Sequence, residues 1–175
     1  MTGSKSYFEA LYQHTKKKVY DHITAKCFAL ADIDDIFQNT YVEVWKALSK
    51  RSDPVPDEEA FVMLIANRQL AKYYSAVRRL RERFAGSFAG SDEDHGDIPD
   101  SFSVEDHIVD RAAVEEIRSL LAEKPLLTQK VFFLRYRRDL TIPEVAGLLG
   151  IGESAVRMHL YKTLSEIKRR LGKEK

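Results

Sequence analysis

The chain has 175 residues, enough for one domain or two small ones, and its 44% hydrophobic and 31% charged residues suit a helix-rich globular protein. No run of about 18 apolar residues occurs and the N-terminus lacks an apolar signal core, so we expect no membrane span and no secretory signal. Cys27 is the only cysteine. An internal disulfide is therefore excluded, and we expect a cytoplasmic protein.

The formal net charge of +1 hides an uneven distribution of charge along the chain. Residues 1–84 carry 14 basic and 11 acidic side chains, a net charge of +3, and residues 125–175 carry 11 basic and 5 acidic, a net of +6. Between them, residues 85–124 carry 3 basic and 11 acidic side chains, a net of −8. A polyanion would therefore bind the two basic blocks and not the chain as a whole.

Apolar periodicity predicts a helix from residue 6 to about residue 30, and a second helix from Asp32 to Leu48. Asp32 or Asp34 can cap the start of the second helix. The basic run at residues 16–18 is interpreted as a solvated face. A loop with two prolines is expected over residues 49–58.

A long helix is predicted from Glu59 to Arg83. Its inner side is expected to hold Phe61, Leu64, Ile65, Val77 and Leu80. Between these positions lie arginines, a lysine and two tyrosines. Two interpretations stay open: the cations follow phosphates while the tyrosine rings stack on unpaired bases, or the helix is a solvated basic surface with buried tyrosines.

Residues 85–104 are rich in Gly, Ser and Asp and show no helical or strand period, which predicts a linker. A helix is expected to resume from Glu105 to Leu121. After Pro125, Thr128 can cap another helix that runs through Leu134 and Tyr136.

The C-terminal stretch has the pattern of two short helices joined by a turn. Thr141 and Glu144 have the spacing of a capping box, Pro143 suits a first helical turn, and Gly150 can end the helix in the left-handed conformation. In the second helix the apolar face is expected to hold Val156, Leu160, Leu164, Ile167 and Leu171. This pattern, with a basic second helix, predicts a helix-turn-helix whose second helix enters the major groove. A helical hairpin that only packs is the alternative.

Motifs for catalysis and metal binding are missing from the sequence. It contains no glycine-rich phosphate loop, GxSxG elbow, HExxH or CxxC, and its five histidines are scattered. We therefore expect neither an enzyme nor a metal site, and no cofactor.

Three stretches, in this order, resemble the small bacterial sigma factors of the extracytoplasmic-function (ECF) group of the sigma-70 family. They are DDIFQNTYVEVW (Asp34–Trp45), FVMLIANRQLAKYYSAVRRLR (Phe61–Arg81) and the helix-turn-helix from Leu140 to Leu171. The resemblance covers nearly the whole chain. Met158 and His159 depart from the family pattern, which has small or basic residues there.

The resemblance implies an all-α fold of two small helical domains. These would be sigma region 2 over residues 1–84 and a region 4 helix-turn-helix over residues 105–175, joined by a flexible acidic linker over residues 85–104. It also implies a factor that binds the RNA polymerase core, at the β′ clamp and the β flap, and directs initiation at promoter DNA with −10 and −35 elements. An anti-sigma factor is a further expected partner.

The same resemblance assigns candidate site residues. Contacts with the core polymerase would come from Asp35, Gln38, Asn39 and Trp45. Contacts with the −10 element would come from Asn67, Arg68, Lys72, Tyr73, Arg78 and Arg79. Contacts with the −35 element would come from Ser154, Ala155, Arg157, Met158, Tyr161, Lys162 and Arg169, with Ser154, Ala155, Met158 and Lys162 at base edges and the others at phosphates. The alternatives are a stand-alone helix-turn-helix regulator, which would read palindromic sites as a dimer, and a module that binds only a partner protein.

Overall fold

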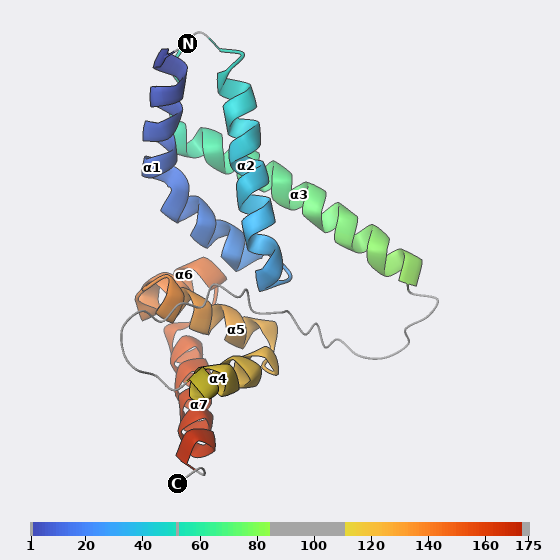
Figure 1. Ribbon diagram of the computed structural model, residues 1–175, viewed down its shortest axis with the longest axis vertical. Coiled ribbons are helices and arrows are strands. Elements are labelled where there is room, and N and C mark those ends of the chain that lie inside the picture. Colours follow the sequence, from blue (N-terminus) through green and yellow to red (C-terminus); the bar gives the residue numbers. More distant parts are fainter. Residues whose placement is uncertain (1, 52, 85–110, 173–175) are drawn as a thin grey trace. The chain divides into compact units, whose positions relative to one another are not determined.

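In a computed structural model of the chain, residues 2–51, 53–84 and 111–172 are described, and every regular element among them is a helix (Figure 1). The residues divide into two compact units, one containing α1, α2 and α3 and the other containing α4 to α7. The predicted linker and the start of the helix expected from Glu105 lie outside the described residues. None of the described helices combines the length and the apolar character needed to cross a membrane.

The N-terminal unit contains α1 (Thr2–Lys26), α2 (Ile33–Leu48) and α3 (Glu58–Phe84). Along the chain, a short 3-10 turn at Leu30–Asp32 precedes α2. The three helices pack against one another, and α3 crosses the other two obliquely (Figure 1). The buried apolar side chains include Leu11, Val19 and Ile23 of α1, Ile33, Ile36, Val44 and Leu48 of α2, and Val62, Ile65, Ala66 and Leu70 of α3.

Among the described side chains, the inner face of α3 differs from the prediction at one position, and the side chain of Leu80 lies outside them. Leu64, expected inside, is 51% exposed, whereas Val62 is fully buried. Because two residues correspond to about 200° around a helix, Val62 and Leu64 lie on nearly opposite sides. Val62, Ile65, Ala66 and Leu70 follow the three-and-four spacing of one face, and that face is the one that packs.

The predicted cap of α2 is also wrong. Asp32 occupies the N-cap position, but its side chain makes no capping hydrogen bond. Its Oδ2 instead accepts a hydrogen bond of 2.7 Å from the hydroxyl of Tyr73 on α3. The other candidate, Asp34, accepts a hydrogen bond of 2.9 Å from the hydroxyl of Tyr20 on α1. Both carboxylates therefore join helices to one another.

Aromatic rings fill the seam between α1 and α2. Tyr41 is packed edge-on against Tyr12 and Phe37, with ring centroids 4.8 and 4.9 Å apart. Its hydroxyl is 2.8 Å from the hydroxyl of Thr15, which itself donates to the carbonyl of Leu11. Burial raises the pKa of Tyr41 from 10.0 to about 12. The hydrogen bond between Tyr41 and Thr15 opposes this rise, and nearby Tyr12 adds to it.

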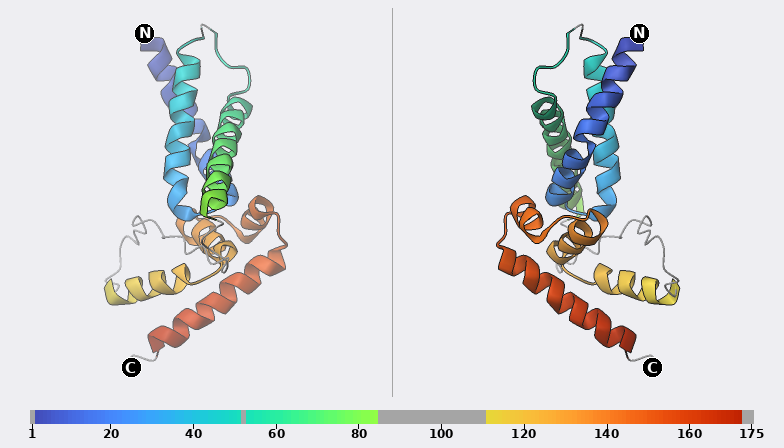
Figure 2. Two further views of the ribbon diagram at one scale, coloured as in Figure 1. Left: turned by 90° about the vertical axis from the view of Figure 1, so that its right-hand side faces the viewer. Right: turned by 90° about the vertical axis from the view of Figure 1, so that its left-hand side faces the viewer.

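The C-terminal unit consists of α4 (Arg111–Ala122), α5 (Leu126–Phe132), a π-helical turn at Phe133–Arg137, α6 (Ile142–Leu149) and α7 (Glu153–Leu171). Figure 2 shows α6 beside the start of α7, and α4 beside its C-terminal half. This unit has its own core, built from Leu121, Val131, Phe132, Leu134, Leu140, Val145, Ala146, Val156 and Leu160.

Thr128, predicted as a helix cap, lies inside α5 and is buried. The helix begins directly after Pro125, whose carbonyl accepts the N–H groups of Thr128 and Gln129 at 2.8 and 3.2 Å. A proline suits this boundary because its missing N–H would have no partner there. The threonine hydroxyl is therefore available for a contact with another helix.

Candidate nucleic-acid interface

The helix-turn-helix of α6 and α7 forms as predicted. Thr141 and Glu144 make the capping box, in which the backbone N–H and the hydroxyl of Thr141 both lie 2.8 Å from Oε2 of Glu144. Gly150 ends α6 with φ 66° and ψ 33°, the left-handed conformation that glycine adopts without cost. Gly152 is the N-cap of α7.

On α7 the predicted apolar face turns inward, with Val156 and Leu160 buried and Leu164, Ile167 and Leu171 partly buried. Of the seven candidate contacts with the −35 element, Ala155 is partly buried and the other six side chains are exposed: Ser154, Arg157, Met158, Tyr161, Lys162 and Arg169. Two large hydrophobic side chains are conspicuous among them, Met158 at 58% exposed and Tyr161 at 64%. The first turns of α7 therefore present the mixed surface that a major-groove helix needs.

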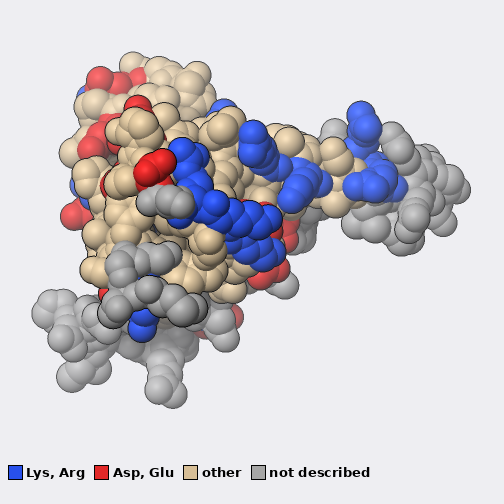
Figure 3. Space-filling model, turned by 90° about the horizontal axis from the view of Figure 1, so that it is seen from above, with Lys and Arg blue, Asp and Glu red and all other residues tan. Residues whose placement is uncertain are grey.

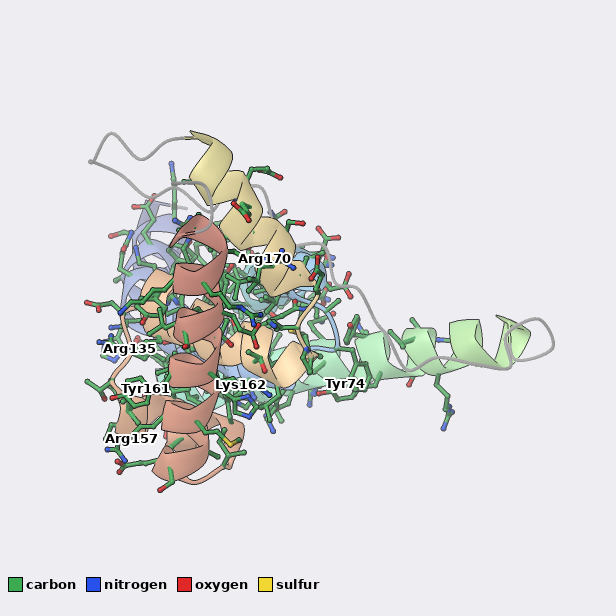
Figure 4. All side chains as sticks on the ribbon, turned by 90° about the horizontal axis from the view of Figure 1, so that it is seen from below. Tyr74, Arg135, Arg157, Tyr161, Lys162 and Arg170 are labelled. Carbon is green, nitrogen blue, oxygen red and sulfur yellow. The ribbon has the colours of Figure 1, made fainter. Side chains whose placement is uncertain are left out.

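The exposed side chains of α7 divide between two sides of the helix. Arg157 and Tyr161 lie on one side and Lys162 on the other (Figure 4). Arg157 is not isolated, because its Nη2 donates to Oε2 of Glu153 at 2.8 Å, one helical turn earlier. This pair orients the guanidinium at the start of the helix.

On the Lys162 side, α7 packs against the turn between α4 and α5. Thr128 Oγ1 is 2.9 Å from Nδ1 of His159, and Lys124 pairs with Glu166. The hydrogen bond from Lys124 holds the pKa of Glu166 below its usual value, although partial desolvation opposes the shift. Sequence reasoning missed both His159 and Thr128, because the two positions are 31 residues apart and no local signal connects them.

On α3, the six candidate contacts with the −10 element are placed along the outer part of the helix. Arg68, Lys72, Arg78 and Arg79 are exposed. Asn67 is also exposed, and its Oδ1 is 2.8 Å from Nε2 of His22 on α1. In Figure 3, Lys and Arg side chains lie along the arm formed by α3. This band is a suitable surface for a polyanion.

The two tyrosines of α3 are tied to other helices. Tyr73 is partly buried and donates to Asp32, and Tyr74 donates to the backbone carbonyl of Lys26 at 2.7 Å. Their ring centroids are 5.8 Å apart. Partial burial also raises the pKa of Tyr74. Each ring therefore keeps a fixed position, with part of its surface exposed.

On α2, three of the four candidate contacts with the polymerase core, Asp35, Gln38 and Asn39, are exposed side chains at the helix surface. The fourth, Trp45, is 39% exposed and packs edge-on against Phe8 of α1, with centroids 5.2 Å apart.

A groove of about 470 Å³ runs between α2 and α3. It is lined by Asp35, Asn39 and Glu43 on the first helix and by Lys72 and Tyr73 on the second. A hydrogen bond from Lys46 holds the pKa of Glu43 below its usual value. The groove therefore places acidic side chains of α2 opposite a lysine of α3. Among the described residues there is no group of three or more His, Cys, Asp or Glu side chains that could hold a metal ion.

The chain is similar to known proteins in a family model, in two curated relatives and in a solved structure. Residues 115–167 match the family model for sigma-70, region 4. The ECF RNA polymerase sigma factor ShbA of Streptomyces griseus is 28% identical over 137 residues, which cover 78% of this chain and 70% of the relative. The ECF RNA polymerase sigma factor BldN of Streptomyces coelicolor is 22% identical over 169 residues, covering 97% of this chain and 62% of the relative.

Among solved structures, the sigma factor RpoE in complex with the anti-sigma factor NepR, from Bartonella quintana, has a TM-score of 0.48 and 12% identity, covering 98% of both chains. Because the TM-score is below 0.5, no conclusion about this chain is drawn from that structural likeness. The region 4 match falls on the helix-turn-helix described above, and the ShbA and BldN alignments extend over most of the chain. Residues 115–167 therefore match sigma-70 region 4, and most of the chain is similar to sigma factors of the extracytoplasmic-function group.

Proposed function

We propose that this chain binds the RNA polymerase core and directs initiation at promoters that it recognises through a −10 and a −35 element. The observation that carries the proposal is the helix-turn-helix, whose α7 begins at a glycine turn and exposes Arg157, Met158, Tyr161 and Lys162. A helix with this exposure fits the major groove, where its side chains reach base edges and flanking phosphates. The sigma factors that the chain resembles act in transcription initiation, which agrees with this proposal.

The N-terminal unit would supply the other two contacts. The exposed polar positions of α2, Asp35, Gln38 and Asn39, would meet the β′ clamp of the polymerase. The cations of α3 would hold the −10 strand by its phosphates, while the fixed tyrosines offer ring faces to unpaired bases. Residues 1–84 and 105–175 would act as the two domains, with residues 85–104 as linker. A β flap contact and an anti-sigma factor are part of the same proposal.

The test is reconstitution with sigma-free bacterial core polymerase. Fragmented genomic DNA from the source organism serves as template, and transcript 5′ ends are mapped by sequencing. We expect defined start sites, sharing two upstream elements, only when the chain is present. Binding to palindromic DNA without polymerase, together with no start sites, would instead favour a stand-alone regulator.

A variant of α2 tests the polymerase contact separately. Asp35→Ala should weaken binding to the core enzyme by about tenfold, because it removes one charged contact. Gln13→Ala, at an exposed position of α1, is the control and should bind like the parent chain. Equal affinity of both variants for the core would remove Asp35 from the interface and leave the initiation assay to decide the function.

A further inference from the structure

A pocket of about 310 Å³ lies on the side of α7 that faces the turn between α4 and α5. Lys124 and Thr128 line it from that turn and from α5, and Met158, His159 and Lys162 line it from α7. It lies beside the second and third turns of the helix that carries the candidate −35 contacts. It is therefore placed to meet DNA that flanks the major groove.

The two carboxylates that line the pocket are engaged by cations. Glu166 pairs with Lys124, and Glu123 accepts a hydrogen bond of 3.2 Å from Arg170. These pairs also fasten the turn between α4 and α5 to α7. Lys162, which is exposed, therefore supplies positive charge to a pocket whose acidic groups are already compensated.

His159 is held in one orientation by a buried partner. Thr128 is only 5% exposed, and its Oγ1 lies 2.9 Å from Nδ1 of His159. When the hydroxyl donates to Nδ1, the imidazole proton is on Nε2, which then becomes a hydrogen-bond donor. In that arrangement Nε2–H can donate to an anionic oxygen.

We propose that this pocket binds one phosphate of the DNA backbone, with Nε2–H of His159 and the ammonium of Lys162 as donors, and with Thr128 as the residue that positions His159. The assignment rests on the proposed function. A helix in the major groove is bordered by phosphates on both sides, and the pocket lies on the side of α7 away from Arg157 and Tyr161 (Figure 4). In the proposed arrangement, His159 and Lys162 would reach a phosphate on this side rather than a base edge.

The experiment uses the full chain in holoenzyme with core polymerase, bound to a promoter obtained from the mapped start sites. Single phosphates along both strands of the −35 region are replaced one at a time by neutral methylphosphonates. Binding is measured for the parent chain and for His159→Ala, His159→Gln, Thr128→Val and Lys162→Ala. Lys168→Ala is the matched control, an exposed cation of α7 that does not line the pocket.

At one phosphate position we expect the methylphosphonate to weaken binding by the parent chain by about threefold to tenfold, as for a lost hydrogen bond. The same substitution should have no effect on holoenzyme carrying His159→Ala or Lys162→Ala, but its full effect with Lys168→Ala. Lys162→Ala should also make the negative slope of log affinity against log salt shallower by about 0.9. His159→Gln keeps a hydrogen-bond donor near the position of Nε2, so the methylphosphonate should again weaken binding by most of its original factor. Thr128→Val removes the group that positions His159 and should make this effect smaller.

Two results would overturn the inference. The phosphate site is refuted if every methylphosphonate weakens binding equally in the parent chain and in the variants at positions 159 and 162. A loss confined to one base pair, with no phosphate coupling, would reassign His159 to base readout. In both cases the parent holoenzyme still initiates, so the proposed function survives. If the parent holoenzyme selects no promoter, the proposed function and the phosphate site fall together.

Discussion

Two glycines of the helix-turn-helix should respond in opposite ways to the same substitution. Gly150 ends α6 with φ 66°, in the left-handed region. Gly147 lies inside α6, three residues earlier, with no positive φ. A Cβ added at either position would meet no atom within 4 Å. Alanine at these positions therefore tests the backbone alone, without a steric clash.

The expected magnitudes follow from the backbone conformations. Gly150→Ala should lower the free energy of unfolding of the C-terminal unit by about 1–2 kcal/mol, the cost of the left-handed conformation for a residue with a Cβ. Gly147→Ala should raise it by about 0.8–1 kcal/mol, the difference in helix propensity between glycine and alanine. The two alanine variants should therefore differ by about 2–3 kcal/mol.

The assay is urea unfolding of the full chain, followed by far-ultraviolet circular dichroism. Amide hydrogen exchange with mass spectrometry then locates the change in residues 142–171 and shows whether residues 2–48 are unaffected. Two alanine variants that shift the stability in the same direction would refute the assignment of Gly150 to a left-handed cap.

Two further predictions concern single residues in each unit. Because the pKa of Tyr41 is raised from 10.0 to about 12 in the folded chain, the unfolded chain loses this proton first. The raised pKa of Tyr41 contributes about 3 kcal/mol to the free energy of unfolding below pH 10, and this contribution is lost as the pH rises to 12. Tyr41→Phe should therefore reduce the decrease in the free energy of unfolding between pH 10 and 12. Tyr161→Phe, at an exposed tyrosine, is the control and should leave that decrease unchanged. The same pH dependence of the free energy of unfolding in both variants would contradict this prediction. Asp139 has φ 53°, in the left-handed region. Asp139→Ala should therefore lower the free energy of unfolding in urea by about 1 kcal/mol, whereas Asp139→Gly should not lower it. Equal stability of the two variants would count against backbone strain at this position.

The features that sequence reasoning predicted correctly depend on neighbours within one or two helical turns. The capping box of Thr141 and Glu144 and the left-handed Gly150 are examples, since each involves groups that are close along the chain. The pair of Glu153 and Arg157 is equally local but was not predicted. Its spacing of four residues on a helix was visible in the sequence and would have predicted the contact.

The two incorrect predictions of helix caps concern side chains whose partners lie far away in the sequence. Asp32 and Thr128 both have the chemistry of helix caps, yet their oxygens are used by Tyr73 and His159, which are 41 and 31 residues away. A tertiary hydrogen bond competes directly with a cap for the same oxygen. The pocket beside α7 arises in the same way, because the turn between α4 and α5 and the third turn of α7 meet only after folding.

Trp45 has a practical consequence for measuring assembly. It is the only tryptophan of the chain, and it lies partly exposed on the same helix as Asp35, Gln38 and Asn39. Its indole emission therefore reports on solvent access at one end of α2 without any added label. A protein that covers this helix will exclude water from the ring and shift the emission to shorter wavelength, which gives a direct titration signal with a tryptophan-free fragment of the partner.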